Sequence, residues 1–251
     1  MFSLFLITPF KLMLLGLITI LGITIVRYSW VAFSGEIERG RFLRALLMTL
    51  ATVVLVIVSN HLLLFWIAWV CVSLSLHHLI LFYPQRPRAQ LAAHKKFLLA
   101  RLSEVLLAVA FIVLYSQFKT ASISHIVQQA ADAGGSIPMD IAAVLLALVA
   151  LIKCAQLPIH GWLIQVVEAP TPVSALLHAG IVNLGGILLL FFAPVLAAST
   201  VACGLLVVLA GVSATLAGLV STTRISVKVK LAWSTSSQMG LMLVEIGLGL
   251  Y

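Results

Sequence analysis

Charged residues are rare in this chain, and acidic residues are the rarest of them. Only 9% of the 251 residues are Asp, Glu, Lys or Arg, and only seven residues are acidic. A soluble domain keeps roughly a quarter or more of its surface charged to stay in solution. The composition therefore excludes an ordinary soluble domain.

Cysteine is equally scarce, and its placement excludes several kinds of site. Cys71, Cys154 and Cys203 all lie in apolar segments, and none belongs to a CxxC pair. This excludes a disulfide framework and a cysteine ligand set for a cluster, so we interpret them as small buried hydrophobic residues. The sequence also contains no nucleotide-binding loop and no nucleophile beside a base. We therefore expect no cofactor and no enzymatic activity of the chain by itself.

Hydrophobic residues, in contrast, make up 63% of the chain. Apolar stretches of about 20 residues recur, and a helix of about that length crosses the hydrocarbon core of a bilayer. A helix also satisfies its own backbone hydrogen bonds in lipid. The formal net charge of +8 does not indicate nucleic-acid binding, because the basic residues fall in short loops and form no basic face. The sequence predicts an all-α, polytopic helical bundle in a lipid bilayer.

Eight membrane helices are predicted from the apolar stretches. They cover residues 10–33, 42–59, 62–83, 97–118, 139–160, 172–196, 199–221 and 229–250. The connection 120–138 is the longest, and its segment 121–131 is predicted to form a short surface helix. We expect residues 1–33 to form an N-terminal transmembrane helix and residues 34–251 to form one transmembrane domain.

The basic residues are distributed unevenly between the two sides of this predicted bundle. One side carries Arg39, Arg41, Arg44, Arg86, Arg88, Lys95, Lys96, Arg101, Arg224, Lys228 and Lys230. The other side carries Lys119, with Lys11 near the N-terminus. The positive-inside rule then places the N-terminus outside and the loops 34–44, 84–96, 161–171 and 222–230 in the cytoplasm.

Lys153 is the main candidate for a functional residue. It follows more than ten apolar residues in the segment AVLLALVALIKCAQLPIH. A lysine at bilayer depth costs about 3 kcal/mol on insertion scales, so such residues usually serve a function. Desolvation disfavours the charged form, which allows proton exchange near neutral pH. The alternative is a lysine that extends toward the cytoplasmic end of its helix, which Pro158 brings near.

Other ionisable residues cluster after Lys153. His160 is seven residues further on, so it is predicted to share a helix face with Lys153. Pro158 removes a backbone donor and is predicted to open the helix. Glu168 and His178 follow in and after a proline-rich stretch, and irregular backbone at this depth is tolerated where it lines a wet cavity. The cluster indicates a proton relay; the alternative is that the histidines are hydrogen-bonded packing residues.

Two earlier helices carry further candidates, Glu104 in the fourth and His77 in the third. A zinc or copper site is a possible alternative use of the histidines. No pair among His77, His78, His160 and His178 has the i, i+4 spacing of a helical metal motif, so no metal site is predicted.

The stretch KCAQLPIHGWLIQVVEAPTPVSALLHAG resembles the signature of the proton-conducting antiporter-like family. That family includes the large membrane subunits of respiratory complex I, such as NADH dehydrogenase subunit 5, and the Mrp cation/proton antiporters. The matching positions are Lys153, Gln156, Pro158, His160, Trp162, Glu168, Pro170, Thr171, Pro172, Ser174 and His178. The segment VKLAWSTSSQMG is similar to a second family motif, whose lysine falls on Lys228, one residue before this segment. Arg101 and Glu104 fall where the family has arginine and aspartate.

The resemblance implies proton transfer through buried lysines, histidines, water and a glutamate–lysine pair. The lysine of that pair corresponds to Lys153, and its glutamate corresponds to the residue after Trp69, which is Val70 in this chain. His77 lies seven residues after Val70 on the same helix face, so our hypothesis is that it occupies part of the lost carboxylate's site.

The missing glutamate, together with FYPQRP and HKKF, resembles the DabB subfamily of inorganic-carbon transporter subunits. That resemblance implies an ion-conducting subunit, for protons or sodium, in the bacterial inner membrane. It also implies a large cytoplasmic partner, a zinc-containing subunit of the DabA kind. Ion flow would drive the hydration of carbon dioxide and its trapping as bicarbonate.

Two alternatives remain open from the sequence. One is a complex I or Mrp-type subunit, against which Val70 argues, and the other is a membrane anchor whose buried charges are remnants. Members of the family are usually about twice this length and contain two inverted helix bundles. The chain is therefore expected to hold the first bundle and to be incomplete at its C-terminus.

Overall fold

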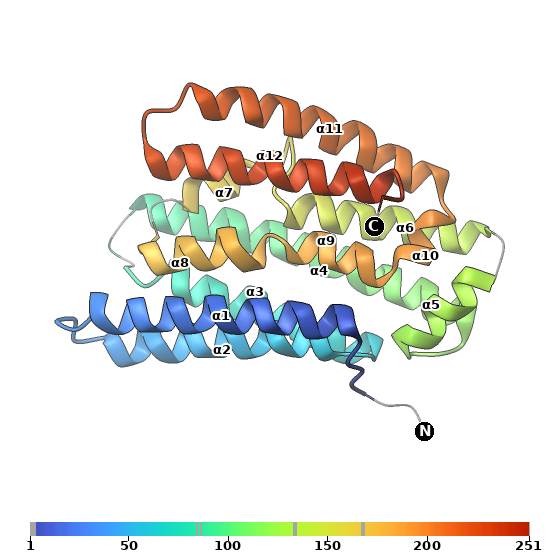
Figure 1. Ribbon diagram of the computed structural model, residues 1–251, viewed down its shortest axis with the longest axis horizontal. Helices are drawn as coiled ribbons and strands as arrows, with labels where there is room; N and C mark the ends of the chain where they lie inside the picture. The colour runs from blue at the N-terminus through green and yellow to red at the C-terminus, as the bar shows by residue number, and fades with distance from the viewer. Residues whose placement is uncertain (1–3, 84, 86, 133–134, 167–168, 251) are drawn as a thin grey trace.

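The computed structural model describes residues 4–83, 85, 87–132, 135–166 and 169–250, which form a bundle of helices along one long axis (Figure 1). The helices are α1 Pro9–Ala32, α2 Arg39–Val58, α3 Leu62–Ile80, α4 Pro87–Phe118, α5 Ile123–Asp132, α6 Ile137–Lys153, α7 Gly161–Gln165, α8 Thr171–Leu176, the π-helical turn η2 Leu177–Ile181, α9 Leu184–Phe191, α10 Ala193–Ala197, α11 Thr200–Thr222 and α12 Val227–Gly247. Figure 1 shows α1 and α2 along one side and α11 and α12 along the other. The broken helices α6 to α9 lie between these pairs.

The described chain contains six helical segments that are long and apolar enough to cross a membrane. They are Pro9–Ala32, Arg39–Val58, Leu62–Ile80, Gln90–Phe118, Thr171–Phe191 and Thr200–Thr222. The other two predicted spans are present as α6, which has 17 residues, and α12, which carries a run of polar side chains. Large apolar side chains such as Ile20, Ile112 and Leu219 face outward, as expected for a surface in contact with lipid. The chain is a multi-pass membrane protein.

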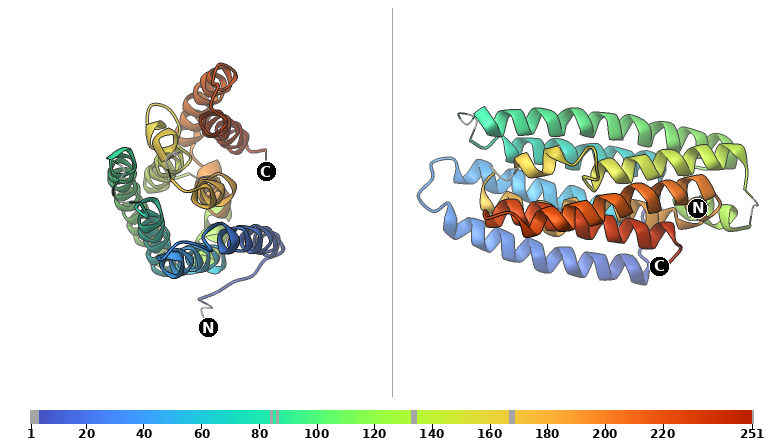
Figure 2. Two further views of the ribbon diagram at one scale, coloured as in Figure 1. Left: turned by 90° about the vertical axis from the view of Figure 1, so that its left-hand side faces the viewer. Right: turned by 90° about the horizontal axis from the view of Figure 1, so that it is seen from above.

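The arrangement of helix ends matches the predicted grouping of the loops. The last turns of α1, α3 and α11 and the first turns of α2, α4 and α12 lie at one end of the bundle (Figures 1 and 2). The short helix α7 and the start of α8 lie at the same end. The connections predicted to be cytoplasmic therefore share one end, and their placement on the cytoplasmic side stays a prediction. The predicted surface helix is α5, at the opposite end.

The fifth predicted helix, 139–160, is wrong at its C-terminal end, because α6 stops at Lys153. Ala155 adopts a left-handed conformation with φ of 52°, and Gln156 N–H donates to the Leu151 carbonyl at 3.0 Å. Ala155 N–H donates to Ile152 at 3.2 Å, so these bonds form a Schellman cap. Pro158 cannot donate to a helix and restricts the residue before it, so the chain leaves the helix upstream.

The sixth predicted helix, 172–196, is interrupted as well. It consists of α8, the π-helical turn η2, α9 and α10, with His178 inside the π-helical turn. Val182 N–H donates to the Leu177 carbonyl at 3.2 Å, which is the long-range bond of a π-helix. Such turns are frequently found at functional sites.

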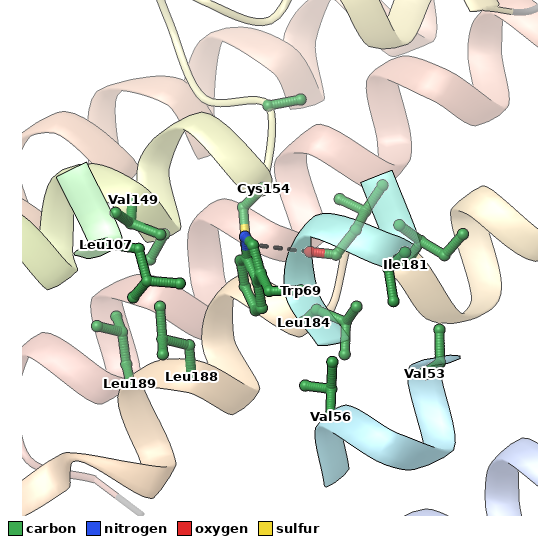
Figure 3. Close-up of a cluster of buried hydrophobic side chains, with 14 of the residues drawn as sticks. Val53, Val56, Trp69, Leu107, Val149, Cys154, Ile181, Leu184, Leu188 and Leu189 are labelled. Atoms are coloured by element: carbon green, nitrogen blue, oxygen red, sulfur yellow. Dashed lines mark hydrogen bonds between the residues drawn. The ribbon is translucent and has the colours of Figure 1, made fainter. Parts of the chain in front are cut away.

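The core between these broken helices is apolar and closely packed. Figure 3 shows Trp69 and Cys154 among aliphatic side chains that include Leu184 and Leu188. The Cys154 thiol donates to the Val182 carbonyl at 3.3 Å and is buried, as the sequence predicted. Gly185 permits this close approach of α6 and α9, because a Cβ there would lie 2.6 Å from the Cys154 sulfur and 2.9 Å from the Ala150 carbonyl oxygen.

Gly185→Ala is therefore expected to destabilise the protein. The added methyl group meets a backbone carbonyl and a buried sulfur, and overpacking of this kind costs about 1–3 kcal/mol. The matched control is Gly204→Ala in α11, where the new Cβ meets nothing within 4 Å. The measurement is thermal melting of the purified protein in detergent. Equal melting temperatures for the two variants would contradict the close packing of α6 on α9.

Candidate functional site

Lys153 is the last residue of α6 and is buried, with 9% of its surface exposed. Its Nζ lies 4.7 Å from the centroid of the Trp69 ring on α3. The ring face and the negative end of the α6 dipole both stabilise an ammonium charge at this place. The face of the Trp69 ring therefore contacts this lysine. Trp69 directly precedes Val70, the position at which the family resemblance places a carboxylate.

A small internal cavity of about 20 Å³ lies beside Lys153. It is lined by Trp69, Leu76, Lys96, Leu99, Ala100, Ser103, Glu104, Ile152, Lys153, Trp162 and Ile181. A cavity of this volume has room for about one water molecule, provided that polar groups of its lining bond it. The structure thus brings Lys153 and Glu104, two residues predicted from the sequence, to the walls of one cavity.

Glu104 is held in place by neighbours on α3 and α4. Its carboxylate accepts a hydrogen bond of 2.8 Å from Arg101 Nη2, and the same nitrogen donates to the Ser73 hydroxyl at 3.3 Å. The Trp66 indole donates to the backbone carbonyl of Glu104 at 2.9 Å. Glu104 is 4% exposed, so the ion pair with Arg101 lies at the edge of the buried region.

Lys96 is a functional candidate that the sequence analysis missed. It was predicted to be a loop charge, and this is wrong, because α4 begins at Pro87 and Lys96 is 5% exposed. Its Nζ donates to the Ser73 carbonyl at 2.6 Å and lies 3.4 Å from the Ser73 hydroxyl. The signal was available in the spacing: Lys96 precedes Ser103 by seven residues, which places both on one helix face.

His178 makes a directional hydrogen bond with α12. Its Nδ1 lies 2.9 Å from the Thr235 hydroxyl, and that hydroxyl donates to the Leu231 carbonyl at 2.8 Å. A hydroxyl has one hydrogen, so Nδ1–H of His178 is the donor to Thr235. The other ring nitrogen is then able to accept a proton, which suits a relay residue.

His160 is not on one helix face with Lys153, and that prediction is wrong because α6 ends before it. It precedes α7, and its ring centroid lies 5.0 Å from that of Trp233 on α12. Its Nδ1 is buried and has no hydrogen-bond partner in the part of the chain that the structure describes. Glu168 lies outside the described residues.

The break after Lys153 is held by side chains of α11 and α12. Gln156 donates from Nε2 to the Ser236 carbonyl at 3.1 Å, and the Ser236 hydroxyl donates to the Ala155 carbonyl at 2.9 Å. Leu157 N–H donates to the Ser213 hydroxyl at 2.9 Å. Ser236 is next to Thr235, so one turn of α12 contacts both the break and His178. Gln156 and Ser236 stand in the two family motifs, but the sequence indicated no role for them, and Ser213 lies outside both motifs.

The remaining two candidates lie away from the cavity lining. His77 is half-buried, with its ring centroid 5.1 Å from that of Phe97, and its buried Nδ1 has no hydrogen-bond partner among the described residues. Lys228 is exposed in the first turn of α12. The structure therefore groups Lys153 and Glu104 with Lys96 at the cavity. His77 does not line the cavity but is close enough to Lys96 for their charges to interact, whereas Lys228 is not part of this group.

Comparison with known proteins agrees with this architecture. Residues 59–251 match the family described as NADH:quinone oxidoreductase/Mrp antiporter, TM. The chain is 54% identical over 247 residues to the probable inorganic carbon transporter subunit DabB of Hydrogenovibrio crunogenus, in an alignment that covers 98% of this chain and 48% of that protein. It is 33% identical over 240 residues to NADH-quinone oxidoreductase subunit L of Escherichia coli, in an alignment that covers 94% of this chain and 39% of that protein. The predicted resemblances to the family and to DabB are confirmed.

A solved structure has the same fold. The chain superposes on the Mrp complex from Dietzia sp. DQ12-45-1b with a TM-score of 0.84 and 27% sequence identity, over 94% of this chain and 26% of that chain. The chain spans less than half the length of the curated relatives named above. The relatives are membrane subunits of larger assemblies by their names.

Proposed function

Because the chain belongs to the NADH:quinone oxidoreductase/Mrp antiporter family, we propose that it is an ion-conducting membrane subunit of an inorganic-carbon uptake complex. The observation that carries ion conduction is the cavity lined by Lys153, Glu104 and Lys96. Buried ionisable groups are expensive in a membrane and usually mark an ion pathway. The 54% identity to a probable inorganic carbon transporter subunit supports the role in carbon uptake.

The proposed transfer step uses Lys153 as the central exchanging group. Its ammonium form is stabilised by the Trp69 ring and the end of α6, whereas desolvation favours its neutral form. Glu104 supplies the counter-charge from across the cavity. His178, through the ring nitrogen that does not bond Thr235, is proposed to exchange protons on the far side of the break.

The partner is proposed to be a large cytoplasmic zinc subunit of the DabA kind, with the assembly in a bacterial inner membrane. In this arrangement the partner combines carbon dioxide with water to give bicarbonate and a proton. The membrane subunit is then no enzyme by itself and supplies the ion flow that makes the reaction run in one direction.

A second candidate is a subunit of complex I or of an Mrp antiporter. The 33% identity to NADH-quinone oxidoreductase subunit L and the TM-score of 0.84 to the Mrp complex favour it. The lack of a carboxylate at Val70 argues against it, because the resemblance to those relatives implies a glutamate there.

The test is growth of a bacterium that lacks carbonic anhydrase, in ordinary air. Coexpression of the complete subunit that carries this chain with its DabA-like partner is expected to restore growth, and either subunit alone is expected to fail. Oxidation of NADH and sodium tolerance are measured in the same strains. Restored NADH oxidation or sodium tolerance without growth in air would replace the proposed function by the second candidate.

A further inference from the structure

We infer that Lys96 is a second proton-exchanging residue of the cavity and that the ion conducted at this site is the proton and not sodium. This inference rests on the proposed ion conduction and adds the identity of the ion. Lys96 and Lys153 come from different helices, α4 and α6, and both line the cavity with Glu104.

The position of Lys96 leaves part of its ammonium group available to the cavity. An ammonium has three N–H donors. One bonds the Ser73 carbonyl at 2.6 Å, and the Ser73 hydroxyl is a weaker partner at 3.4 Å. Lys96 thus has a fixed position and at least one donor that these contacts do not use.

Two unpartnered polar atoms mark the place of a bridging water. The Ser103 hydroxyl and the Trp162 Nε1 are buried and have no hydrogen-bond partner among the described residues, and both residues line the same cavity. A buried water needs two to four polar partners, and the cavity of about 20 Å³ has room for one. A water bonded to Ser103 and Trp162 is then within the cavity that Lys96, Lys153 and Glu104 enclose.

The balance of charge at the cavity decides between the two ions. Among the described residues, the ionisable groups that face it are Lys96 and Glu104 from α4 and Lys153 from α6. Arg101 is bonded to Glu104, and His77 of α3 is close enough to Lys96 for their charges to interact. If both lysines were protonated, three cations would share one carboxylate in a buried region, which is strongly unfavourable. One lysine is therefore neutral and can receive the proton that the other releases. A sodium ion would add positive charge where Glu104, the one carboxylate among the described residues of the cavity lining, already pairs with Arg101.

The test compares Lys96→Arg with Lys95→Arg in the complete subunit, assembled with its partner and reconstituted in liposomes. Arginine keeps the positive charge and the donors, and it does not release its proton at physiological pH. Lys95 is the matched control, because it is the adjacent residue of α4 and is exposed. Lys96→Arg is expected to lower the proton flux at least tenfold, measured with a pH-sensitive dye, and Lys95→Arg is expected to leave it unchanged.

Further measurements distinguish failure of this inference from failure of the proposed function. Proton flux of the unmodified complex is expected to be the same with and without sodium, and a sodium requirement overturns the inference. Thermal melting checks that Lys96→Arg folds. Lys96→Gln is an uncharged variant and is expected to lose proton flux as well. Flux of Lys96→Arg equal to that of the unmodified complex overturns this inference alone. An unmodified complex that conducts neither ion overturns the proposed function and this inference together.

Discussion

Replacement of Lys153 by methionine is expected to abolish growth in air of the carbonic-anhydrase-deficient strain. Methionine keeps the length of the side chain and removes the only proton-exchanging group at the end of α6. A positioned side chain that transfers a proton contributes about 100-fold or more to a rate. We therefore expect ion flux in liposomes to fall by about that factor.

The melting temperature of Lys153→Met distinguishes a loss of function from a loss of folding. A charged lysine at bilayer depth costs about 3 kcal/mol, so an apolar replacement is expected to keep or raise the melting temperature. Lys230→Met, at an exposed position on α12, is the control and is expected to change neither growth nor melting. Growth in air that survives Lys153→Met would exclude Lys153 from the proton pathway.

The long helices could be predicted from the sequence because lipid imposes one simple requirement on them. The predicted spans 10–33, 42–59 and 199–221 differ from α1, α2 and α11 by at most a few residues at either end. Each is a single apolar run that must satisfy its own backbone in lipid. No neighbouring helix is needed to decide where such a run begins.

For the broken helices, the sequence predicted that a break occurs but did not predict the residue at which the helix ends. Pro158 indicated that the fifth helix opens, and the helix does open, yet it ends at Lys153, five residues before the proline. The segment after the helix end is held by a hydrogen bond that Ser213 accepts and one that Ser236 donates, and both serines lie more than 50 residues away in the sequence. Partners that arrive through tertiary packing leave no local pattern for a sequence-based prediction to use.

Some residues of the candidate site could be identified from the sequence, and one could not. Lys153 and Glu104 were identified because a charge in an apolar run is conspicuous at any depth. Lys96 was missed because it lies next to Lys95 in a basic stretch that has the composition of a cytoplasmic loop. Only the start of α4 at Pro87 turns its side chain inward, while that of Lys95 stays exposed. Helix phase, which depends on where the helix begins, separates a buried charge from its exposed neighbour.

Glu104→Gln is expected to destabilise the protein far more than Glu38→Gln. Both glutamates pair with an arginine three residues away on one helix, at 2.8 Å in the Arg101 pair and 3.0 Å in the Arg41 pair. The Glu104 side chain is 5% exposed and that of Glu38 is 53% exposed. Breaking a buried pair costs about 3 kcal/mol or more, whereas exposed pairs contribute about 0–1 kcal/mol.

The comparison is made by thermal melting of each variant in detergent. Glu104→Gln is expected to lower the melting temperature by about 5 °C or more, and Glu38→Gln by no more than about 2 °C. The same change at Glu104 removes the counter-charge of Lys153 and Lys96, so ion flux is expected to fall together with stability. If the two variants melt at the same temperature and conduct ions equally well, the carboxylate of Glu104 contributes neither to stability nor to ion conduction. If Glu104→Gln melts early and still conducts fully, the ion pair with Arg101 serves only to hold α4, and the lysines exchange protons without it.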